Sequence, residues 1–282
     1  TEASTHRLLT ASVGNEPSLA DVLKMVHPQP KDAEQAAVFA WLIGKPFDMN
    51  ALPQVIQDYE MVKRGVSTDL PDVPFQMLTH LDLSTAQWTS IAKNMGWQAL
   101  RINLNTLLRH GVFNDVTMVD FVAARLGDEQ SIRKAKAFPY QLLMAYQAAK
   151  QEMPVVISEA LQDALEHSLV NVPHLAGKKV VVCPDVSGSM QSPATGFRKG
   201  ATTSVRCIDV AGLVAAAMLR SNPETIVLPF ENQVVDIRLN GRDSVMTNAK
   251  RLANIGGGGT NCSAPLAWLK KKKMTVDVVI FV

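Results

Sequence analysis

The chain has 282 residues, 47% hydrophobic and 19% charged, a composition typical of a soluble globular protein with room for two domains. No run approaches the roughly 18–20 apolar residues of a membrane span, and no signal-peptide pattern opens the sequence. The three cysteines, Cys183, Cys207 and Cys262, have neither metal-like nor disulfide-like spacing. We therefore expect reduced thiols in a cytoplasmic protein with no membrane partner.

The overall charge of +2 hides an asymmetry between the two parts of the chain. Residues 1–176 carry 14 Lys and Arg against 19 Asp and Glu, a net charge of −5, whereas residues 177–282 carry 14 against 7, a net charge of +7. Net charge alone therefore argues against nucleic-acid binding by the first part, and such a function would depend on a local basic patch.

Residues 1–176 have the pattern of helices joined by short turns, without a strand signal. Ser18 and Asp32 are good N-cap residues, and Gly44 is typical of a helix end. After a frayed helix end within 1–16, helices are predicted at residues 19–26, 32–43, 51–64, 75–81, 84–95, 97–110, 115–126, 138–149 and 155–170. The series suggests helix pairs stacked as a HEAT-like solenoid.

Residues 177–282 alternate between strands and helices. Strands are predicted at 180–183, 225–230, 234–239 and 276–282, a polar stretch at 191–205, and helices at 208–219, 244–253 and 264–271. Such alternation predicts a doubly wound parallel sheet. The fold class expected for the whole chain is α plus α/β, with a HEAT-like helical domain in residues 1–176 and a parallel-sheet domain in residues 177–282.

The first predicted strand ends in a loop rich in oxygen ligands. Residues 180–183 form an apolar run without alternation, as expected for a strand covered on both faces. Asp185, Ser187 and Ser189 follow, and a carboxylate with two hydroxyls is a hard ligand set that suits Mg²⁺. Sites in open α/β sheets lie beyond the carboxyl ends of the strands, where this loop falls.

A glycine run at residues 256–259 leads to Thr260, which offers a further hydroxyl ligand. Asp-x-Ser-x-Ser after an apolar strand, with a later Gly-Gly-Thr loop, resembles the metal-ion-dependent adhesion site of von Willebrand factor A domains. The resemblance implies Mg²⁺ or another divalent cation at Asp185, Ser187, Ser189 and Thr260, with an open position for an acidic side chain of a partner. The competing interpretation is that Asp185 and the serines only cap the next helix.

The adhesion site also needs an Asp in a third loop, just after the fourth strand. The strand at 276–282 carries Asp277 at its beginning, which is the wrong end, and the sequence stops at Val282. A domain that ended there would expose an apolar edge strand. We therefore expect this sequence to be a piece of a longer protein.

Four stretches of the helical part are similar to the TROVE module of bacterial Ro-type proteins. They are VGNEPSLADVLKMVHPQP at 13–30, AWLIGK at 40–45, DVPFQML at 72–78 and NLNTLLRHGVF at 103–113. A von Willebrand factor A domain after such a module is the Ro architecture, and the resemblance covers nearly the whole chain. It departs at both ends, where the family has further helices and the second half of the A domain. The family implies a ring of HEAT-like helices closed by the A domain, and we expect a monomer.

The Ro resemblance implies RNA binding without catalysis. In this family the outer surface of the ring binds small structured noncoding RNAs, the Y RNAs, and the ring's hole takes the single-stranded 3′ ends of misfolded RNAs in RNA quality control. An exonuclease is one candidate protein partner, and DNA binding is not expected. The family's Y-RNA surface includes a His that matches His27, with Lys24 and Lys31 as neighbours. Further phosphate contacts are expected from Arg101, Arg109, His110, Arg133, Lys134 and Lys136.

Each of these residues has a plainer interpretation. His27 before a proline fits a helix C-cap, residues 109–110 suit the dipole at a helix end, and residues 133–136 fit a solvated surface. The four lysines at 270–273 fit a cationic helix end as well as a phosphate or partner patch. The tryptophans in apolar stretches are expected in the core rather than as base-stacking platforms: Trp41, Trp88 and Trp97.

Two functions remain open from the sequence. One is a ring-shaped RNA chaperone or tether, favoured by the motifs at His27 and at 103–113. The other is a metal-dependent protein-interaction module on a helical scaffold without direct RNA binding, favoured by the −5 charge of residues 1–176. An enzyme is not expected, because no general base lies near Asp185 in the sequence and the serines resemble ligands rather than nucleophiles.

Overall fold

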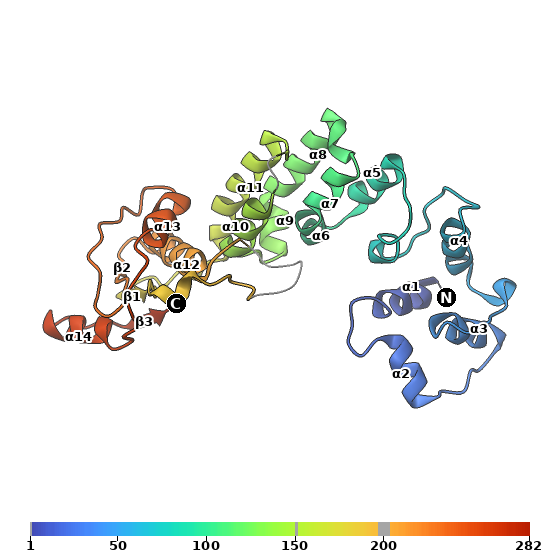
Figure 1. Ribbon diagram of the computed structural model, residues 1–282, viewed down its shortest axis with the longest axis horizontal. Coiled ribbons are helices and arrows are strands. Elements are labelled where there is room, and N and C mark those ends of the chain that lie inside the picture. The colour runs from blue at the N-terminus through green and yellow to red at the C-terminus, as the bar shows by residue number, and fades with distance from the viewer. Residues whose placement is uncertain (1, 150–151, 197–203) are drawn as a thin grey trace. The chain divides into compact units, whose positions relative to one another are not determined.

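The computed structural model describes residues 2–149, 152–196 and 204–282 (Figure 1). The chain falls into two compact units, residues 1–95 and residues 96–282. The domain boundary predicted after residue 176 lies inside the second unit and stays a prediction. Part of the polar stretch predicted at 191–205 lies outside the described residues. Among those described, no helix has the length and apolar character that crossing a bilayer demands.

The described part of the first unit is built from helices. They begin where the sequence supplies side-chain caps: the Ser18 hydroxyl accepts from the Asp21 N–H at 3.1 Å, and the Asp32 carboxylate accepts from the Gln35 N–H at 2.7 Å. The helices are α1 (Glu2–Ala11), α2 (Leu19–Val26), α3 (Ala33–Leu42), α4 (Gln54–Lys63) and α5 (Thr85–Asn94), with 3₁₀ turns η1 (Met49–Ala51) and η2 (Phe75–Met77).

Two helix predictions in this unit were too long. The helix predicted at 51–64 begins at Gln54, because Pro53 restricts Leu52 before it to an extended conformation, which separates η1 from α4. The helix predicted at 75–81 is the single turn η2, whose first residue follows Pro74.

The second unit begins with paired helices. Helix α11 packs against both α8 and α10, and the contacts bury Leu126, Leu142, Ile157 and Leu161 almost completely. The elements are α6 (Trp97–Ile102), α7 (Leu104–Arg109), η3 (Val112–Asn114), α8 (Val116–Gly127), α9 (Glu129–Lys134), α10 (Pro139–Ala148), α11 (Val155–His167) and η4 (Ser168–Asn171).

The single helix predicted at 97–110 is wrong, because the structure divides it at Asn103 into α6 and α7. The Asn103 side-chain Nδ2–H donates to the Ala99 carbonyl at 2.8 Å, which gives the helix end a side-chain partner. Asn competes with backbone hydrogen bonds in this way and so favours helix ends over helix interiors.

The rest of the second unit is a small parallel sheet with strand order β2-β1-β3. Strand β1 pairs in parallel with both neighbours, Val181 with Ile226 on one side and Val180 with Val278 on the other. The elements are β1 (Val180–Cys183), η5 (Gly188–Gln191), α12 (Cys207–Ser221), β2 (Ile226–Val227), α13 (Val245–Ala253), α14 (Ala264–Lys271) and β3 (Val278–Phe281).

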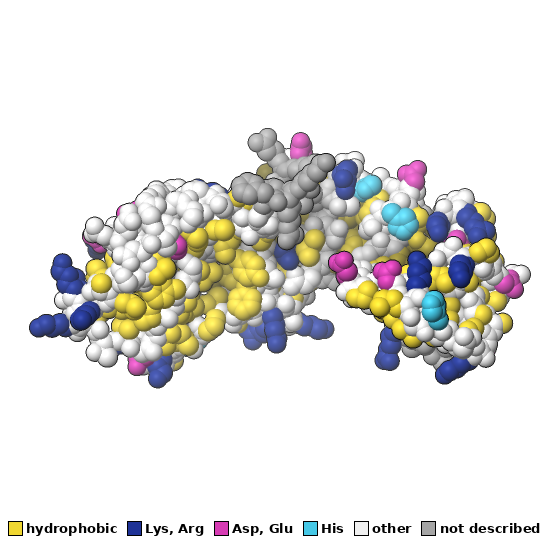
Figure 2. Space-filling view, turned by 60° about the horizontal axis from the view of Figure 1, so that its bottom comes forward, with side chains coloured by type: hydrophobic (Ala, Val, Ile, Leu, Met, Phe, Trp, Pro, Cys, Tyr) yellow, Lys and Arg dark blue, Asp and Glu magenta, His cyan; other side chains and the backbone are white. Residues whose placement is uncertain are grey.

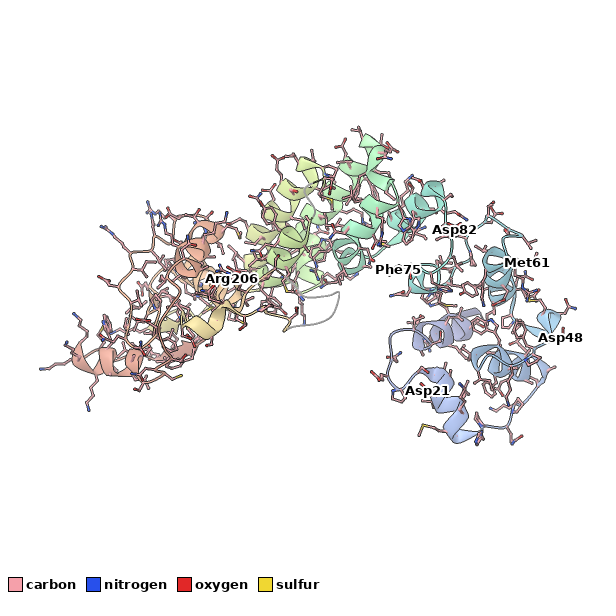
Figure 3. All side chains as sticks on the ribbon, in the orientation of Figure 1. Asp21, Asp48, Met61, Phe75, Asp82 and Arg206 are labelled. Carbon is pink, nitrogen blue, oxygen red and sulfur yellow. The ribbon has the colours of Figure 1, made fainter. Side chains whose placement is uncertain are left out.

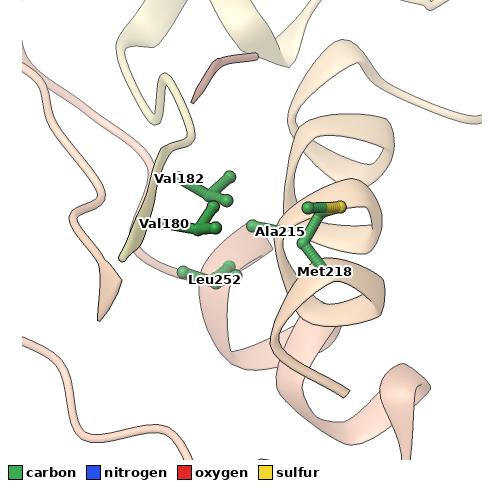
Figure 4. Packing of buried hydrophobic residues seen from close by; sticks show 5 residues of the cluster. All are labelled: Val180, Val182, Ala215, Met218 and Leu252. Atoms are coloured by element: carbon green, nitrogen blue, oxygen red, sulfur yellow. The ribbon is translucent and has the colours of Figure 1, made fainter. Parts of the chain in front are cut away.

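Helices cover both faces of this sheet, as predicted for a doubly wound fold. Val180 and Val182 pack against Ala215 and Met218 of α12 and Leu252 of α13 (Figure 4). On the other face, Val181 and Cys183 pack with Leu269 of α14. All four residues of β1 are buried, which confirms the predicted central strand.

The strand predicted at 234–239 is wrong, since the structure shows a single antiparallel bridge there, between Phe230 and Val234. The Val235 N–H donates to the Pro229 carbonyl at 2.8 Å. Proline has no N–H to return a second bond, so the ladder does not propagate. The strand predicted at 225–230 shortens to β2 for a related reason. Leu228 N–H donates to the Val182 carbonyl, but Pro184 has no N–H to donate back to this segment, so the ladder with β1 is interrupted there.

Candidate metal centre and nucleic-acid interface

The carboxyl ends of the strands bring several loops together. Asp185 follows β1 and forms a parallel bridge with Phe230, which follows β2. On its other side, the Asp185 N–H donates to the carbonyl of Val282, which follows β3, at 2.9 Å. Backbone bonds to both neighbouring segments therefore hold Asp185 at the edge where sites form in parallel sheets.

Three of the predicted ligand hydroxyls lie together at this edge. Ser187 Oγ is 3.2 Å from Ser189 Oγ, and Thr260 Oγ1 donates to Ser187 Oγ at 2.8 Å. The Ser187 N–H also donates to Asp185 Oδ1 at 2.8 Å, so that the carboxylate is tied to the same loop. The structure thus brings together all four predicted metal ligands, although Thr260 is 73 residues from Ser187.

The glycine loop (residues 256–259) is joined by backbone hydrogen bonds to the serine loop, the segment at 185–191 that carries Ser187 and Ser189. The Gly188 N–H donates to the Gly258 carbonyl at 3.1 Å, and the Gly257 N–H donates to the Val186 carbonyl at 3.2 Å. Gly258 has a φ of +66°, in the left-handed region that favours glycine. These bonds hold the two loops together and so place Thr260 beside Ser187.

The turn after β2 lies against the same glycine loop, which the sequence patterns did not reveal. A Cβ atom on Gly258 would collide with the Glu231 carboxylate, and one on Gly259 would lie 2.7 Å from Asn232 Oδ1. The Asn261 N–H donates to the Glu231 carbonyl at 2.8 Å. The available signal was Glu231 itself, an acidic residue directly after a predicted strand that ends at this edge.

Arg206, at the start of α12 (Figure 3), anchors the far end of the serine loop. Its guanidinium pairs with Asp209 at 2.7 Å and donates to Gln191 Oε1 at 2.6 Å. The hydrogen bond to Asp209 raises the pKa of Arg206, which stays charged. On β1, burial raises the pKa of the Cys183 thiol to about 11, so it is neutral and a poor metal ligand at neutral pH.

In the first unit, the predicted RNA-binding residues Lys24, His27 and Lys31 are all exposed. Lys24 lies in the last turn of α2, and His27 is its C-cap residue in the left-handed conformation, with its N–H donating to the Leu23 carbonyl. The C-cap interpretation therefore holds for the His27 backbone, while the imidazole faces solvent. The predicted role of the side chain in RNA binding stays a prediction.

In the second unit, Arg101 differs from the other predicted phosphate contacts. Its guanidinium donates to the Gln141 carbonyl at 2.8 Å and to Gln98 Oε1 at 3.0 Å, and it lies over the Trp97 ring. Burial lowers the pKa of Arg101. Arg109 is exposed at the end of α7 and His110 is half-buried beside it. Arg101 thus has a packing role that the sequence did not reveal.

The remaining predicted basic residues form an exposed group at the end of α9. Arg133 and Lys134 line a surface hollow of about 440 Å³ together with Glu129 and Gln130. Lys136 follows in the left-handed conformation, also exposed. The lysines at 270–273 are exposed at the end of α14, where Lys and Arg side chains project in Figure 2. This exposed position agrees both with a cationic helix end and with a phosphate or partner patch.

The tryptophans do not share one environment. Trp88 and Trp97 are buried, as predicted. The core prediction for Trp41 is wrong, because this residue is only half-buried and its Nε1–H donates to Glu60 Oε1 at 2.9 Å. An indole with one polar partner and one accessible side is common at binding surfaces.

Helical repeats joined to a parallel sheet, with an Asp-x-Ser-x-Ser loop at its carboxyl edge, define a helical module followed by a von Willebrand factor A domain. Family comparison agrees: the TROVE domain model matches residues 22–180 and the Ro60 vWA domain model matches residues 179–282. The chain belongs to the TROVE-domain family, which confirms the predicted Ro resemblance and fold class.

The sequence is similar to known proteins that are longer than the part it covers. It is 25% identical over 300 residues to RNA-binding protein RO60 of Deinococcus radiodurans, covering 93% of this chain and 52% of that protein. It is 24% identical over 176 residues to RNA-binding protein RO60 of Caenorhabditis elegans, covering 59% and 26%. The crystal structure of the Deinococcus radiodurans RO (RSR) protein matches 98% of this chain and 60% of its own, with a TM-score of 0.70 and 21% identity. The chain therefore spans about half, or less, of the curated relatives it matches.

Proposed function

We propose that this protein binds RNA without catalysis, through basic side chains of its helical part, and holds a divalent cation in its von Willebrand factor A domain. The finer proposal is that the RNAs are small structured noncoding RNAs and the 3′ ends of misfolded RNAs, in the service of RNA quality control. Membership of the TROVE-domain family carries the proposal, since two relatives bear the name RNA-binding protein.

The exposure of the predicted contacts supports RNA binding despite the net charge of −5 on residues 1–176. Lys24, His27 and Lys31 are exposed within the short segment that ends α2 and leads to α3, and Arg133, Lys134 and Lys136 form a second exposed group. RNA recognition depends on such local groups, which contact phosphates and unpaired bases, rather than on the total charge.

The experiment is a filter-binding titration of a small structured RNA across a salt series. His27→Ser is expected to weaken binding several-fold, and the affinity of both proteins should fall steeply with salt because phosphate contacts release counterions. His6→Ser is the matched control, since His6 is an exposed imidazole on α1 outside the proposed surface. Equal affinities for wild type and His27→Ser would remove His27 from the interface, and no binding at low salt would reject the RNA function.

The oxygen distances support the cation proposal. Adjacent ligands of an octahedral Mg²⁺ site with bonds of about 2.1 Å lie about 3 Å apart. Ser187 Oγ lies 2.8 Å from Thr260 Oγ1 and 3.2 Å from Ser189 Oγ, close to that spacing. With Asp185 as the carboxylate, these groups would hold the ion. A bound cation would supply an electropositive position for an acidic ligand.

That chemistry favours a second candidate function, a metal-dependent contact with an acidic side chain of a protein partner. Ser189 and Thr260 are exposed, so a bound ion would be accessible from solvent. An exonuclease is one such partner in the proposed quality-control role. The two functions are compatible, because the predicted RNA contacts and the loop cluster use different residues.

A further inference from the structure

A cleft in the first unit is lined by none of the predicted RNA contacts or metal ligands. It has a volume of about 320 Å³, within the range of small-ligand sites. Helix α3 contributes Trp41, α4 contributes Tyr59 and Lys63, and the segment at η2 contributes Gln76 and His80. In Figure 3, Met61 marks α4 and Phe75 marks η2. Aromatic rings, an amide, an imidazole and an ammonium group thus line one hollow.

The buried carboxylate of Glu60 organises one wall of this cleft. Glu60 Oε1 accepts from Trp41 Nε1–H at 2.9 Å and pairs with Lys63 Nζ at 3.1 Å, and Oε2 lies 3.7 Å from the Arg64 guanidinium. Two cations pair with one carboxylate, so this ion group beside the cleft has a net positive charge, and its Lys63 lines the cleft itself. The Trp41 ring also meets Tyr59 edge-to-face, with centroids 6.1 Å apart. These contacts fix the orientation of the rings before any ligand arrives.

The other wall offers hydrogen-bonding groups. The Tyr59 hydroxyl lies 3.2 Å from the Met77 carbonyl and 3.3 Å from His80 Nε2. The hydroxyl donates its one proton to that carbonyl, so the contact with His80 Nε2 is a hydrogen bond when that ring nitrogen carries a proton. The exposed Gln76 amide adds both a donor and acceptor. Such groups match the mixed donor and acceptor edge of a nucleobase.

A second cleft of the first unit differs from the cleft at Trp41 in the charge of its lining, which makes it a poor site for RNA. That cleft is larger, about 480 Å³, and His6 is its one basic side chain among the lining residues of the described chain. It is also lined by Glu34, Asp58 and Asp72, and three carboxylates repel a polyanion. Among the described residues that line the cleft at Trp41, none is acidic, and the adjacent Glu60 carboxylate is paired with Lys63. At the right-hand end of Figure 2, Lys, Arg and His side chains lie beside apolar surface of this unit.

We propose that the cleft of Trp41, Tyr59, Lys63, Gln76 and His80 takes an unpaired nucleobase of a bound RNA strand. The half-buried Trp41 ring would stack on the base, while Tyr59, which is only 4% exposed, supports that ring from behind. Gln76 and His80 would meet the polar edge of the base, and Lys63 would contact an adjacent phosphate. This inference rests on the proposed RNA-binding function and adds to it a pocket that distinguishes single strands from duplexes, whose bases are already stacked.

The test compares fluorescence anisotropy of labelled RNA as a single strand, as a duplex and as a structured small RNA. Trp41→Leu is expected to weaken single-strand binding about tenfold, the effect of losing one stacking contact, with little change for the duplex. Because Trp41 also packs against Tyr59, the double variant Gln76→Ala/His80→Ala serves as the second test. Both of its side chains are exposed, so it should fold, and it should lose single-strand affinity several-fold. His6→Ala, in the acidic cleft, is the control.

A direct readout comes from cross-linking a strand that contains 4-thiouridine. Adducts are expected on peptides that contain Trp41 or His80, whose side chains are accessible, and they should disappear when unlabelled single strand competes. Wild-type binding of structured RNA together with unchanged single-strand binding in both cleft variants would overturn the pocket and leave the proposed function intact. Failure of the wild type to bind any RNA would overturn both.

Discussion

Asp185 is held in place by its backbone as well as by its carboxylate. Its N–H bonds to the Val282 carbonyl, and its Oδ1 accepts the Ser187 N–H, at 2.9 and 2.8 Å. The sequence predicted the four ligand residues because Asp-x-Ser-x-Ser and Gly-Gly-Thr are local patterns. It did not single out Glu231, because the approach of this residue to Gly258 depends on the pairing of β2 with β1.

Replacing Asp185 by Asn keeps the side-chain shape and removes the charge. We expect the Mg²⁺ affinity, measured by isothermal titration calorimetry, to fall at least tenfold. Asp277→Asn is the matched control: Asp277 lies at the opposite end of β3, where its Oδ2 accepts the Lys179 N–H at 2.8 Å. Wild-type Mg²⁺ affinity in the Asp185 variant would reject the ligand assignment.

Helices α12 and α13 approach each other closely at one glycine. A Cβ atom on Gly212 would lie 2.9 Å from the Ala249 carbonyl oxygen and 3.2 Å from Leu252 Cβ. The backbone oxygen cannot move without disturbing α13, whose Leu252 packs on β1. Gly212 therefore sets the spacing of the helix layer on this face of the sheet.

Gly212→Ala should lower the free energy of unfolding by about 1–3 kcal/mol in urea titrations, because overpacking outweighs the gain of about 0.5–1 kcal/mol in helix propensity. Gly127→Ala, at the last residue of α8, is the control, since its added Cβ meets nothing within 4 Å. It should be neutral or slightly stabilising. If Gly212→Ala were as stable as the control, the helices would have more room than their contacts imply.

At the scale of elements, the predictions from sequence were most accurate where local residues alone determine where a helix or strand forms. The caps Ser18 and Asp32 begin helices as predicted, and the buried run of β1 became the central strand. The predictions were less accurate where two segments compete for the same bonds. Asn103 ends a helix that its apolar pattern would continue, and Pro229 prevents a strand at 234–239 that its alternation would allow.

At the scale of the whole molecule, a buried amide contributes to the join between the helices and the sheet in the second unit. Asn222, at the end of α12, accepts the Leu175 N–H at 2.7 Å and donates to the carbonyls of Pro173 and Met218 at 3.0 and 3.3 Å. The segment at 173–175, which leads from the helices towards β1, is therefore hydrogen-bonded to the end of α12. Sequence patterns identify the two architectures but cannot reveal this long-range contact.

Asn222→Asp should destabilise the second unit at pH 7 by about 3 kcal/mol, because a carboxylate would face two carbonyl oxygens without a proton to donate. The buried position raises the pKa of the introduced acid, so the loss of stability should shrink as the pH falls towards about 4 and the acid becomes protonated. Urea denaturation at both pH values measures this difference.

Asn240→Asp is the matched control for this substitution. Asn240 is exposed, and its Oδ1 accepts the Arg242 N–H at 3.0 Å, a bond that a carboxylate retains. Its free energy of unfolding should change little between the two pH values. Equal stabilities for the two Asp variants at pH 7 would mean that the contacts of Asn222 with Pro173 and Leu175 do not stabilise the second unit.

The pairing of β1 also has a consequence for the order in which the protein folds as it is synthesised. The Lys179 N–H, just before β1, donates to the Asp277 carboxylate 98 residues later, whereas the helices form from neighbouring residues. The ribosome therefore releases an apolar central strand long before one of its two partners exists. Until then the open strand edge is exposed to other chains, and the interval before β3 is the stage at which chaperones would protect the nascent protein.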